Sequence, residues 1–211
     1  MGGHDENPQT REVGKRERAA FRDVLATAID VVEGEGIDYV VAGSLCSNHW
    51  GRPSAVGDID LLVAPQDAKR LLKAFDAAGF ETSEDEPQWL YKAKKDGKTV
   101  DVIFEMEGAL YLDDPLVEHA TYVEIEGTLV RLMSAEDFIV SQAVSTGEDT
   151  PDYWYNALGV LAKTELDWDY LVERATRGPR RVLSLLLYAQ SDDRPIPEDA
   201  IRRLFERIYG R

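Results

Sequence analysis

The chain has 211 residues and a formal net charge of −16, with 40 acidic against 24 basic residues. Because an acidic surface repels phosphates, this balance argues against non-specific binding of nucleic acid. The single cysteine, Cys46, excludes an internal disulfide, and the scarcity of histidine argues against a Cys/His zinc site. No apolar run is long enough to cross a bilayer, and the opening residues lack the apolar stretch of a signal peptide, so we expect a cytoplasmic protein.

The first part of the chain predicts a mixed sheet with flanking helices. The polar segment 1–14 predicts a disordered tail. Apolar residues recur at helical spacing from Lys15 to Glu33, and Pro65 opens a second helix that Gly79 closes. The expected strands are 38–42, 58–63, 80–82, 89–93, 99–104, 122–125 and 128–132, with hairpin turns at Lys95-Asp96-Gly97 and Glu126-Gly127 and a short helix ending at Trp50.

The pattern becomes helical after residue 132. Ser134 followed by Asp137 resembles a capping box at a helix start, and Asp167 is placed to cap a later helix. We expect helices to about residue 144, then over 151–162, 167–176, 179–190 and 197–209. The predicted fold class is therefore α/β (α+β): a domain with a mixed β-sheet and flanking helices over 15–132, then a helical bundle over 133–211.

Three carboxylates occur on expected strands. Asp58 and Asp60 lie on one face of a strand with Ile59 on the other, roughly 6.6 Å apart at Cα. That span suits two carboxylates that bracket hard cations about 3.5–4 Å apart, and Mg²⁺ prefers such oxygen ligands. Asp101, between two valines, is costly to bury without a cation or hydrogen bonds, and it is also placed to accept the proton of an attacking hydroxyl. The pattern predicts a divalent-metal site.

A possible phosphate site precedes the acid pair. Gly43-Ser44 ends a strand and opens a short helix, where free N–H groups and the serine hydroxyl favour a phosphate. Arg52 and Ser54, in the loop before Asp58, are placed to contact the remaining phosphates.

Other reactive, charged or aromatic side chains have structural interpretations that are simpler than a role in catalysis or binding. We expect His49 to be a helix-surface or core residue and Cys46 to be buried and inert. The Arg174, Arg177, Arg180 and Arg181 cluster is equally compatible with a solvated face and a binding surface, while Tyr153, Trp154 and Tyr155 favour bundle core over a base-stacking platform.

At Gly43-Ser44, Asp58-x-Asp60 and Asp101 the chain resembles the DNA polymerase β-like nucleotidyltransferase superfamily. It is most similar to a minimal branch with abortive-infection-type toxins and small aminoglycoside nucleotidyltransferases, in which Arg-x-Ser/Thr precedes the acid pair as Arg52-Pro53-Ser54 does here. The resemblance covers about residues 17–205.

The resemblance implies a role for each matched residue. Asp58, Asp60 and Asp101 would bind Mg²⁺, or Mn²⁺ in its place, while Gly43, Ser44 and Arg52 would hold the triphosphate of ATP or another nucleoside triphosphate. The reaction would transfer a nucleoside monophosphate to a hydroxyl of RNA, protein or a small molecule and release pyrophosphate.

One departure from the superfamily concerns phosphate binding. Relatives place a Lys near the position of Gln142, where this chain has no charge, so Arg131 or an Arg of the late cluster would have to replace it.

Two other classes of function compete with an enzyme. The chain is also compatible with a weak or inactive module that binds nucleotide or metal without turnover. The apolar run 182–187 alternatively suits an interaction protein, such as a homodimer or one member of a toxin–antitoxin pair with an antitoxin-like partner.

Overall fold

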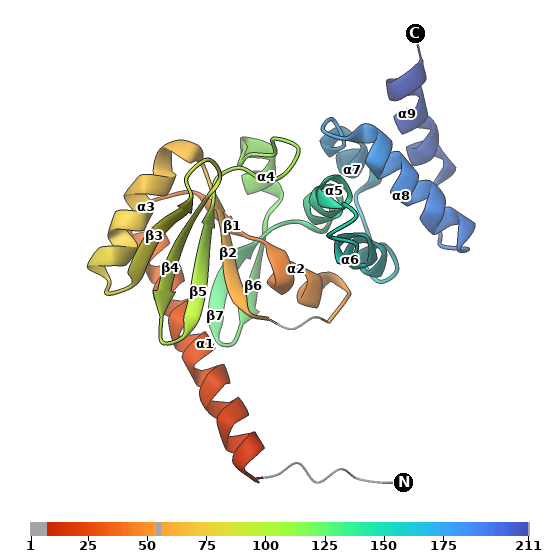
Figure 1. The fold of residues 1–211 in the computed structure, drawn as a ribbon. Helices are drawn as coiled ribbons and strands as arrows, with labels where there is room; N and C mark the ends of the chain where they lie inside the picture. Colours follow the sequence, from red (N-terminus) through yellow and green to blue (C-terminus); the bar gives the residue numbers. More distant parts are fainter. Residues whose placement is uncertain (1–7, 54–55, 211) are drawn as a thin grey trace.

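We describe residues 8–53 and 56–210 of a computed structural model, with side chains from Gly14 onward. Within these residues a seven-stranded mixed sheet has the order β3-β4-β5-β2-β1-β7-β6 (Figure 1). The strands are β1 (Tyr39–Val41), β2 (Asp58–Val63), β3 (Glu81–Glu86), β4 (Leu90–Lys95), β5 (Lys98–Ile103), β6 (Thr121–Ile125) and β7 (Thr128–Leu132).

The centre of the sheet brings two distant segments of the chain into parallel register. β2 pairs antiparallel with β1 and parallel with β5, and Asp60 lies opposite Asp101 in the second pairing. Both expected hairpins form, β4–β5 around Asp96-Gly97 and β6–β7 around Glu126-Gly127. The sheet therefore places the expected carboxylates on neighbouring strands.

One face of the sheet is covered by helices. α1 (Pro8–Gly34) and α3 (Pro65–Ala77) contact each other and β5, and their apolar side chains join one core with Ile59, Val100 and Val102 (Figure 1). Along β5 the burial alternates, since Val100 and Val102 are buried whereas Asp101 is half-buried. Because side chains alternate along a strand, the carboxylates occupy the face opposite the core.

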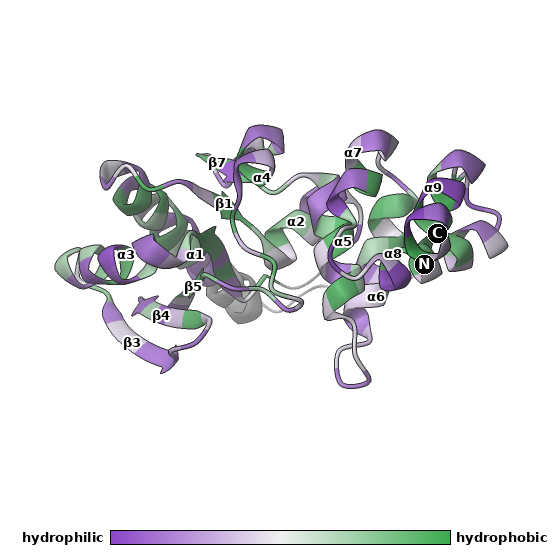
Figure 2. Cartoon of the chain, turned by 90° about the horizontal axis from the view of Figure 1, so that it is seen from above, coloured by the Kyte–Doolittle hydropathy of each residue, from purple (hydrophilic) through white to green (hydrophobic). Residues whose placement is uncertain are grey.

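A helical part follows the sheet and begins with a buried helix. α5 (Ala135–Ser145) is buried along its whole length and contacts α6 (Asp152–Leu161), α7 (Trp168–Arg174) and α8 (Pro179–Ser191). α9 (Glu198–Tyr209) packs on α7 and α8. Seen from above, α2 (Gly43–Trp50) and α5 lie between the sheet and α9 (Figure 2). This arrangement explains why α5 is buried on all sides, its polar residues included.

The structure confirms the predicted fold class and departs from the expected elements at three places. α1 begins at Pro8, inside the segment expected to be a disordered tail, because Pro suits the first turn and charged straight-chain residues sustain the helix. β3 continues to Glu86 rather than ending near Thr82. A short helix, α4 (Asp114–His119), was not predicted, although Asp113 caps it by accepting from the Leu116 N–H.

No helix within residues 8–53 and 56–210 combines the length and apolar character that a membrane span requires.

Candidate active site

The three predicted carboxylates come together on the open face of the sheet. Asp58 is exposed at the start of β2, Asp60 is half-buried two residues later, and Ile59 between them is fully buried. Asp101 on β5 lies directly across from Asp60. The sequence prediction that Asp58 and Asp60 share a face, with Asp101 on a strand of the same sheet, is confirmed.

The turn between β1 and α2 packs directly against the carboxylate of Asp60. Gly43 has φ 61°, and a Cβ placed there would lie 1.8 Å from Oδ2 of Asp60. The backbone N–H of Ser44 donates a hydrogen bond to the same carboxylate. Because any side chain at this position would enter the space of that carboxylate, Gly43 is required for its placement.

The environment of Asp60 disfavours its charged form. Burial, together with repulsion from Asp101 and then Asp58, raises the pKa of Asp60 to about 6. The Lys92 ammonium and the Ser44 N–H oppose this rise. Crowded carboxylates of this kind lower their mutual repulsion when they share a cation.

Lys92 is a site residue that the sequence reasoning missed. Its Nζ lies 2.8 Å from Oδ1 and 3.1 Å from Oδ2 of Asp101, and the two side chains are 24% and 14% exposed. The signal was present in the sequence, because a hairpin turn at Asp96-Gly97 fixes a register in which Lys92 opposes Asp101.

The chemistry of the donor set fits a hard divalent cation at Asp58 and Asp60. Both offer carboxylate oxygens, and a cation there would offset the repulsion that raises the pKa of Asp60. Asp101 differs, because the ammonium of Lys92 contacts both of its oxygens. Accordingly, the described part of the chain contains no group of three or more Asp, Glu, His or Cys spaced to hold an ion together.

Arg52 is directed toward the helical part. Its guanidinium donates to Oδ1 of Asn156 (3.2 Å), and the Asn156 amide donates to Oε1 of Gln142 (3.1 Å). The guanidinium also lies 5.6 Å from the ring centroid of Tyr155. The Arg52 guanidinium is thus linked through Asn156 to Gln142, near the position where relatives place a Lys. Ser54, the other predicted loop residue, lies outside the described residues.

The proposed substitutes for that Lys are engaged elsewhere. Arg131, on β7, donates to Asp38 (3.0 Å) and to the Tyr122 hydroxyl. Arg174, in the late cluster, is paired with Asp137 and Asp113.

The chain matches the model of a family described as "Uncharacterised nucleotidyltransferase" over residues 10–191. It belongs to this nucleotidyltransferase family. The match spans both the sheet and most of the helical part, so the family assignment includes the strands that carry the carboxylates. No curated protein matches this chain significantly by sequence.

Solved structures share the fold of this chain. An antigenic nucleotidyltransferase-like protein from Paracoccidioides brasiliensis is 18% identical, with 88% of this chain and 93% of that chain covered and a TM-score of 0.53. The antibiotic-resistance factor ANT(2″)-Ia in solution is 13% identical, with 82% and 98% covered and a TM-score of 0.52. The crystal structure of ANT(2″)-Ia with adenylyl-2″-tobramycin is 16% identical, with 75% and 97% covered and a TM-score of 0.50.

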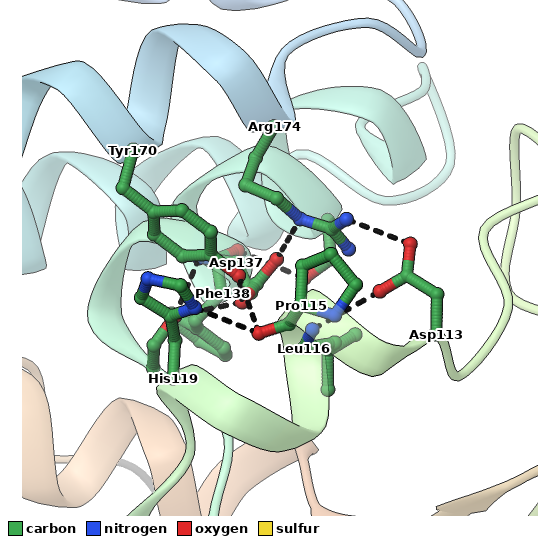
Figure 3. A network of polar contacts seen from close by, with 10 residues as sticks. Asp113, Pro115, Leu116, His119, Asp137, Phe138, Tyr170 and Arg174 are labelled. Atoms are coloured by element: carbon green, nitrogen blue, oxygen red, sulfur yellow. Dashed lines mark hydrogen bonds and ion pairs between the residues drawn. The ribbon is translucent and has the colours of Figure 1, made fainter.

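A partly buried polar network joins α4 to the helical part of the chain (Figure 3). The Asp137 carboxylate accepts from the Tyr170 hydroxyl (2.7 Å) and from Nε of Arg174 (2.5 Å), while Nη1 of Arg174 donates to Asp113 (2.7 Å). The ring of His119 stacks on that of Tyr170 with centroids 3.5 Å apart. Because Asp113 and Asp137 also lie at the starts of α4 and α5, the network fixes where both helices begin.

The simpler interpretations of other side chains are confirmed in part. Cys46 is fully buried, and His49 is an exposed helix residue against the ring of Trp50. The expectation that the aromatic run belongs to the bundle core is wrong for two residues, since Tyr153 and Tyr155 are 37% and 54% exposed. The first turns of α6 lie at the surface, so only part of that helix faces α5.

Proposed function

We propose that this protein is a divalent-metal-dependent nucleotidyltransferase that transfers a nucleoside monophosphate from a nucleoside triphosphate to an acceptor hydroxyl. The observation that carries the proposal is the strand register that sets Asp60 opposite Asp101. The turn at Gly43 packs directly against Asp60. The family assignment supports the same reaction class. The solved complex of ANT(2″)-Ia contains adenylyl-2″-tobramycin, a small molecule that carries an adenylyl group.

Each residue of the site is proposed to have a separate role. The metal, Mg²⁺ or Mn²⁺, held by Asp58 and Asp60 would neutralise charge on the reacting phosphate. The start of α2 lies beside Asp60 and presents its positive end to a triphosphate, at the predicted residues Gly43 and Ser44. Arg52 is proposed to contact the leaving phosphates, with Ser54 as the second contact that the sequence predicts.

Asp101 is proposed to act on the acceptor. It accepts the proton of the attacking hydroxyl as that oxygen forms a bond to the α-phosphorus. The bond between the α-phosphorus and the bridging oxygen breaks, and pyrophosphate leaves with the electron pair. Lys92 holds both oxygens of Asp101 before substrate binds, and this contact orients the carboxylate for the step.

The test is transfer of label from each α-labelled nucleoside triphosphate, with Mg²⁺ and with total RNA, the protein itself and a panel of small hydroxyl compounds as acceptors. We expect label on one acceptor class, lost in an Asp58→Asn/Asp60→Asn double variant and kept in Glu81→Gln, which removes an exposed carboxylate of β3. Transfer that persists in the double variant would contradict the proposal. The same assay tests the toxin-like role, which requires label on RNA or protein.

A second candidate is a module that binds nucleotide or metal without turnover. The Lys92–Asp101 ion pair favours it, because both oxygens of the third carboxylate are already engaged. Calorimetric titration with Mg²⁺ and the nucleotide that gives the largest thermal shift, followed by a product assay, separates the two candidates. Binding with no product on any acceptor class supports the module.

A further inference from the structure

A cavity of about 500 Å³ lies between the end of β5 and the helices α5 and α6. We name it the acidic aromatic pocket. Its lining includes Trp89, Ile103, Glu105, Met106, Glu107 and Tyr153. The volume falls within the range of small-molecule sites.

The pocket adjoins the proposed base. Ile103 lines it and follows Asp101 by two residues on β5, with the buried Val102 between them. Residues two apart on a strand project to the same face at a spacing of roughly 6.6 Å. A small molecule in the pocket can therefore direct a hydroxyl toward Asp101.

Two aromatic side chains from distant parts of the chain line the pocket. Trp89 comes from the turn before β4 and Tyr153 from the start of α6, and they are 41% and 37% exposed. Trp89 is held by its backbone, which donates to the Glu86 carbonyl (2.9 Å) and accepts from the Phe104 N–H (3.0 Å). Large aromatic faces open to a cavity are typical of sites that pack against a ring.

One wall of the pocket is a loop that is held in place by the rest of the structure. Met106 and Leu110 form a β-bridge, and Gly108 between them has φ 79°. A Cβ on Gly108 would lie 2.3 Å from Cγ1 of Val144, so the loop lies directly against α5. The wall that carries Glu105 and Glu107 is therefore formed before any ligand arrives.

The charged side chains that line the pocket are acidic. Glu105 and Glu107 line it, and the described residues of the lining contain no Lys, Arg or His. The Tyr111 hydroxyl donates a hydrogen bond to the Glu105 carboxylate, which raises the pKa of Tyr111. Two carboxylates without a cation among the described lining residues favour a positively charged ligand and repel phosphates.

We infer that the acidic aromatic pocket binds the acceptor, and that this acceptor is a small, cationic, ring-containing molecule with a free hydroxyl. The inference rests on the proposed nucleotidyl transfer and names its substrate class. A polynucleotide acceptor is disfavoured, since its phosphates would lie against Glu105 and Glu107.

The test is calorimetric titration of the full chain, without nucleotide, with three phenols of similar size: tyramine (cationic), tyrosol (neutral) and 4-hydroxyphenylacetate (anionic). We expect tyramine to bind about fivefold more tightly than tyrosol, as for an exposed ion pair, and 4-hydroxyphenylacetate to bind most weakly. A Glu105→Gln/Glu107→Gln variant should remove this order, whereas the control Glu81→Gln/Glu198→Gln, with two exposed acids elsewhere, should keep it.

A second pair of variants tests the aromatic walls. Tyr153→Ala should weaken binding of all three phenols, and Tyr155→Ala, which removes a more exposed tyrosine of the same helix outside the lining, should not. Equal affinity for the three probes, or an order unchanged by Glu105→Gln/Glu107→Gln, would overturn the inference.

The titration and the label-transfer assay together distinguish an error in the pocket inference from an error in the proposed function. Label transfer to RNA that depends on Asp58 and Asp60, with no binding of tyramine, would overturn the pocket and leave nucleotidyl transfer standing. Charge-selective binding with no label transfer to any hydroxyl compound would support the pocket as a cation site and contradict the transferase.

Discussion

Gly43 and Asp60 are in closer contact than any side chain at position 43 would allow. A Cβ built on Gly43 lies 1.8 Å from Oδ2 and 2.6 Å from Cγ of Asp60. The turn after β1 and the carboxylate of β2 therefore occupy the same small volume, and the residue type at position 43 decides where the carboxylate lies.

Gly43→Ala should abolish most of the nucleotidyl transfer. The added methyl displaces Asp60, and φ 61° strains alanine by roughly 1 kcal/mol. Gly36→Ala is a matched control, because Gly36 has φ 63° with no atom within 4 Å of the added Cβ. Gly36→Ala should lose only the stability due to backbone strain and keep label transfer, whereas Gly43→Ala should lose label transfer. Equal activities would contradict the role of the close approach.

Asp60→Asn should inactivate the protein and stabilise it at pH 7.5. The folded pKa of Asp60, about 6, lies above the unfolded value of 3.8, so folded Asp60 holds its proton longer than the unfolded chain does. Stability contributed by this group is therefore lost as the pH rises from about 4 through 6. We expect the variant to be more stable by about 2 kcal/mol at pH 7.5 and by little at pH 4, measured by urea unfolding. A less stable variant at pH 7.5 would refute this account.

Mg²⁺ should raise the Tm more at pH 7.5 than at pH 5. Below the pKa of Asp60 a proton competes with the cation for the carboxylate, and a ligand stabilises only as far as it binds the folded state. The shift should vanish in Asp58→Asn/Asp60→Asn and persist in Glu81→Gln. A shift of equal size in the double variant would place the ion elsewhere.

Lys92→Met should lower the Tm without metal and enlarge the shift that Mg²⁺ produces. The variant leaves Asp101 without its cation, at a cost of about 1–2 kcal/mol, and frees both carboxylate oxygens for the ion. Lys94→Met removes an exposed lysine two residues along β4 and is the control. A smaller Mg²⁺ shift in Lys92→Met would show that Lys92 supports metal binding.

Arg174→Met should cost about 3 kcal/mol of stability, because it leaves the Asp137 carboxylate, 3% exposed, without its cation. Arg177→Met, at an exposed arginine of the same cluster, should cost less than about 0.5 kcal/mol. Urea unfolding of both variants checks the difference. Similar losses would mean that the network in Figure 3 adds little to the stability of the helical part.

The sequence predicted the elements whose signals are local. The limits of β2 and the start of α5 at Ser134 follow from alternation and capping, which act between residues a few positions apart. α4 was missed because it is short and its apolar pattern spans less than two turns, so the Asp113 cap was its main signal. Tyr153 was misplaced because helical spacing does not say how far a helix extends beyond its neighbour.

By itself, the sequence placed the candidate carboxylates Asp58, Asp60 and Asp101 on strands and Gly43 at a turn. The tertiary structure decided what each of them contacts. The parallel register of β2 and β5 pairs Asp60 with Asp101, the hairpin sets Lys92 on Asp101, and Arg52 reaches Asn156 rather than the carboxylates. The physical reason is range: strand and helix signals arise within a few residues, whereas pairing, burial and charge neighbours depend on segments separated by tens of residues along the chain.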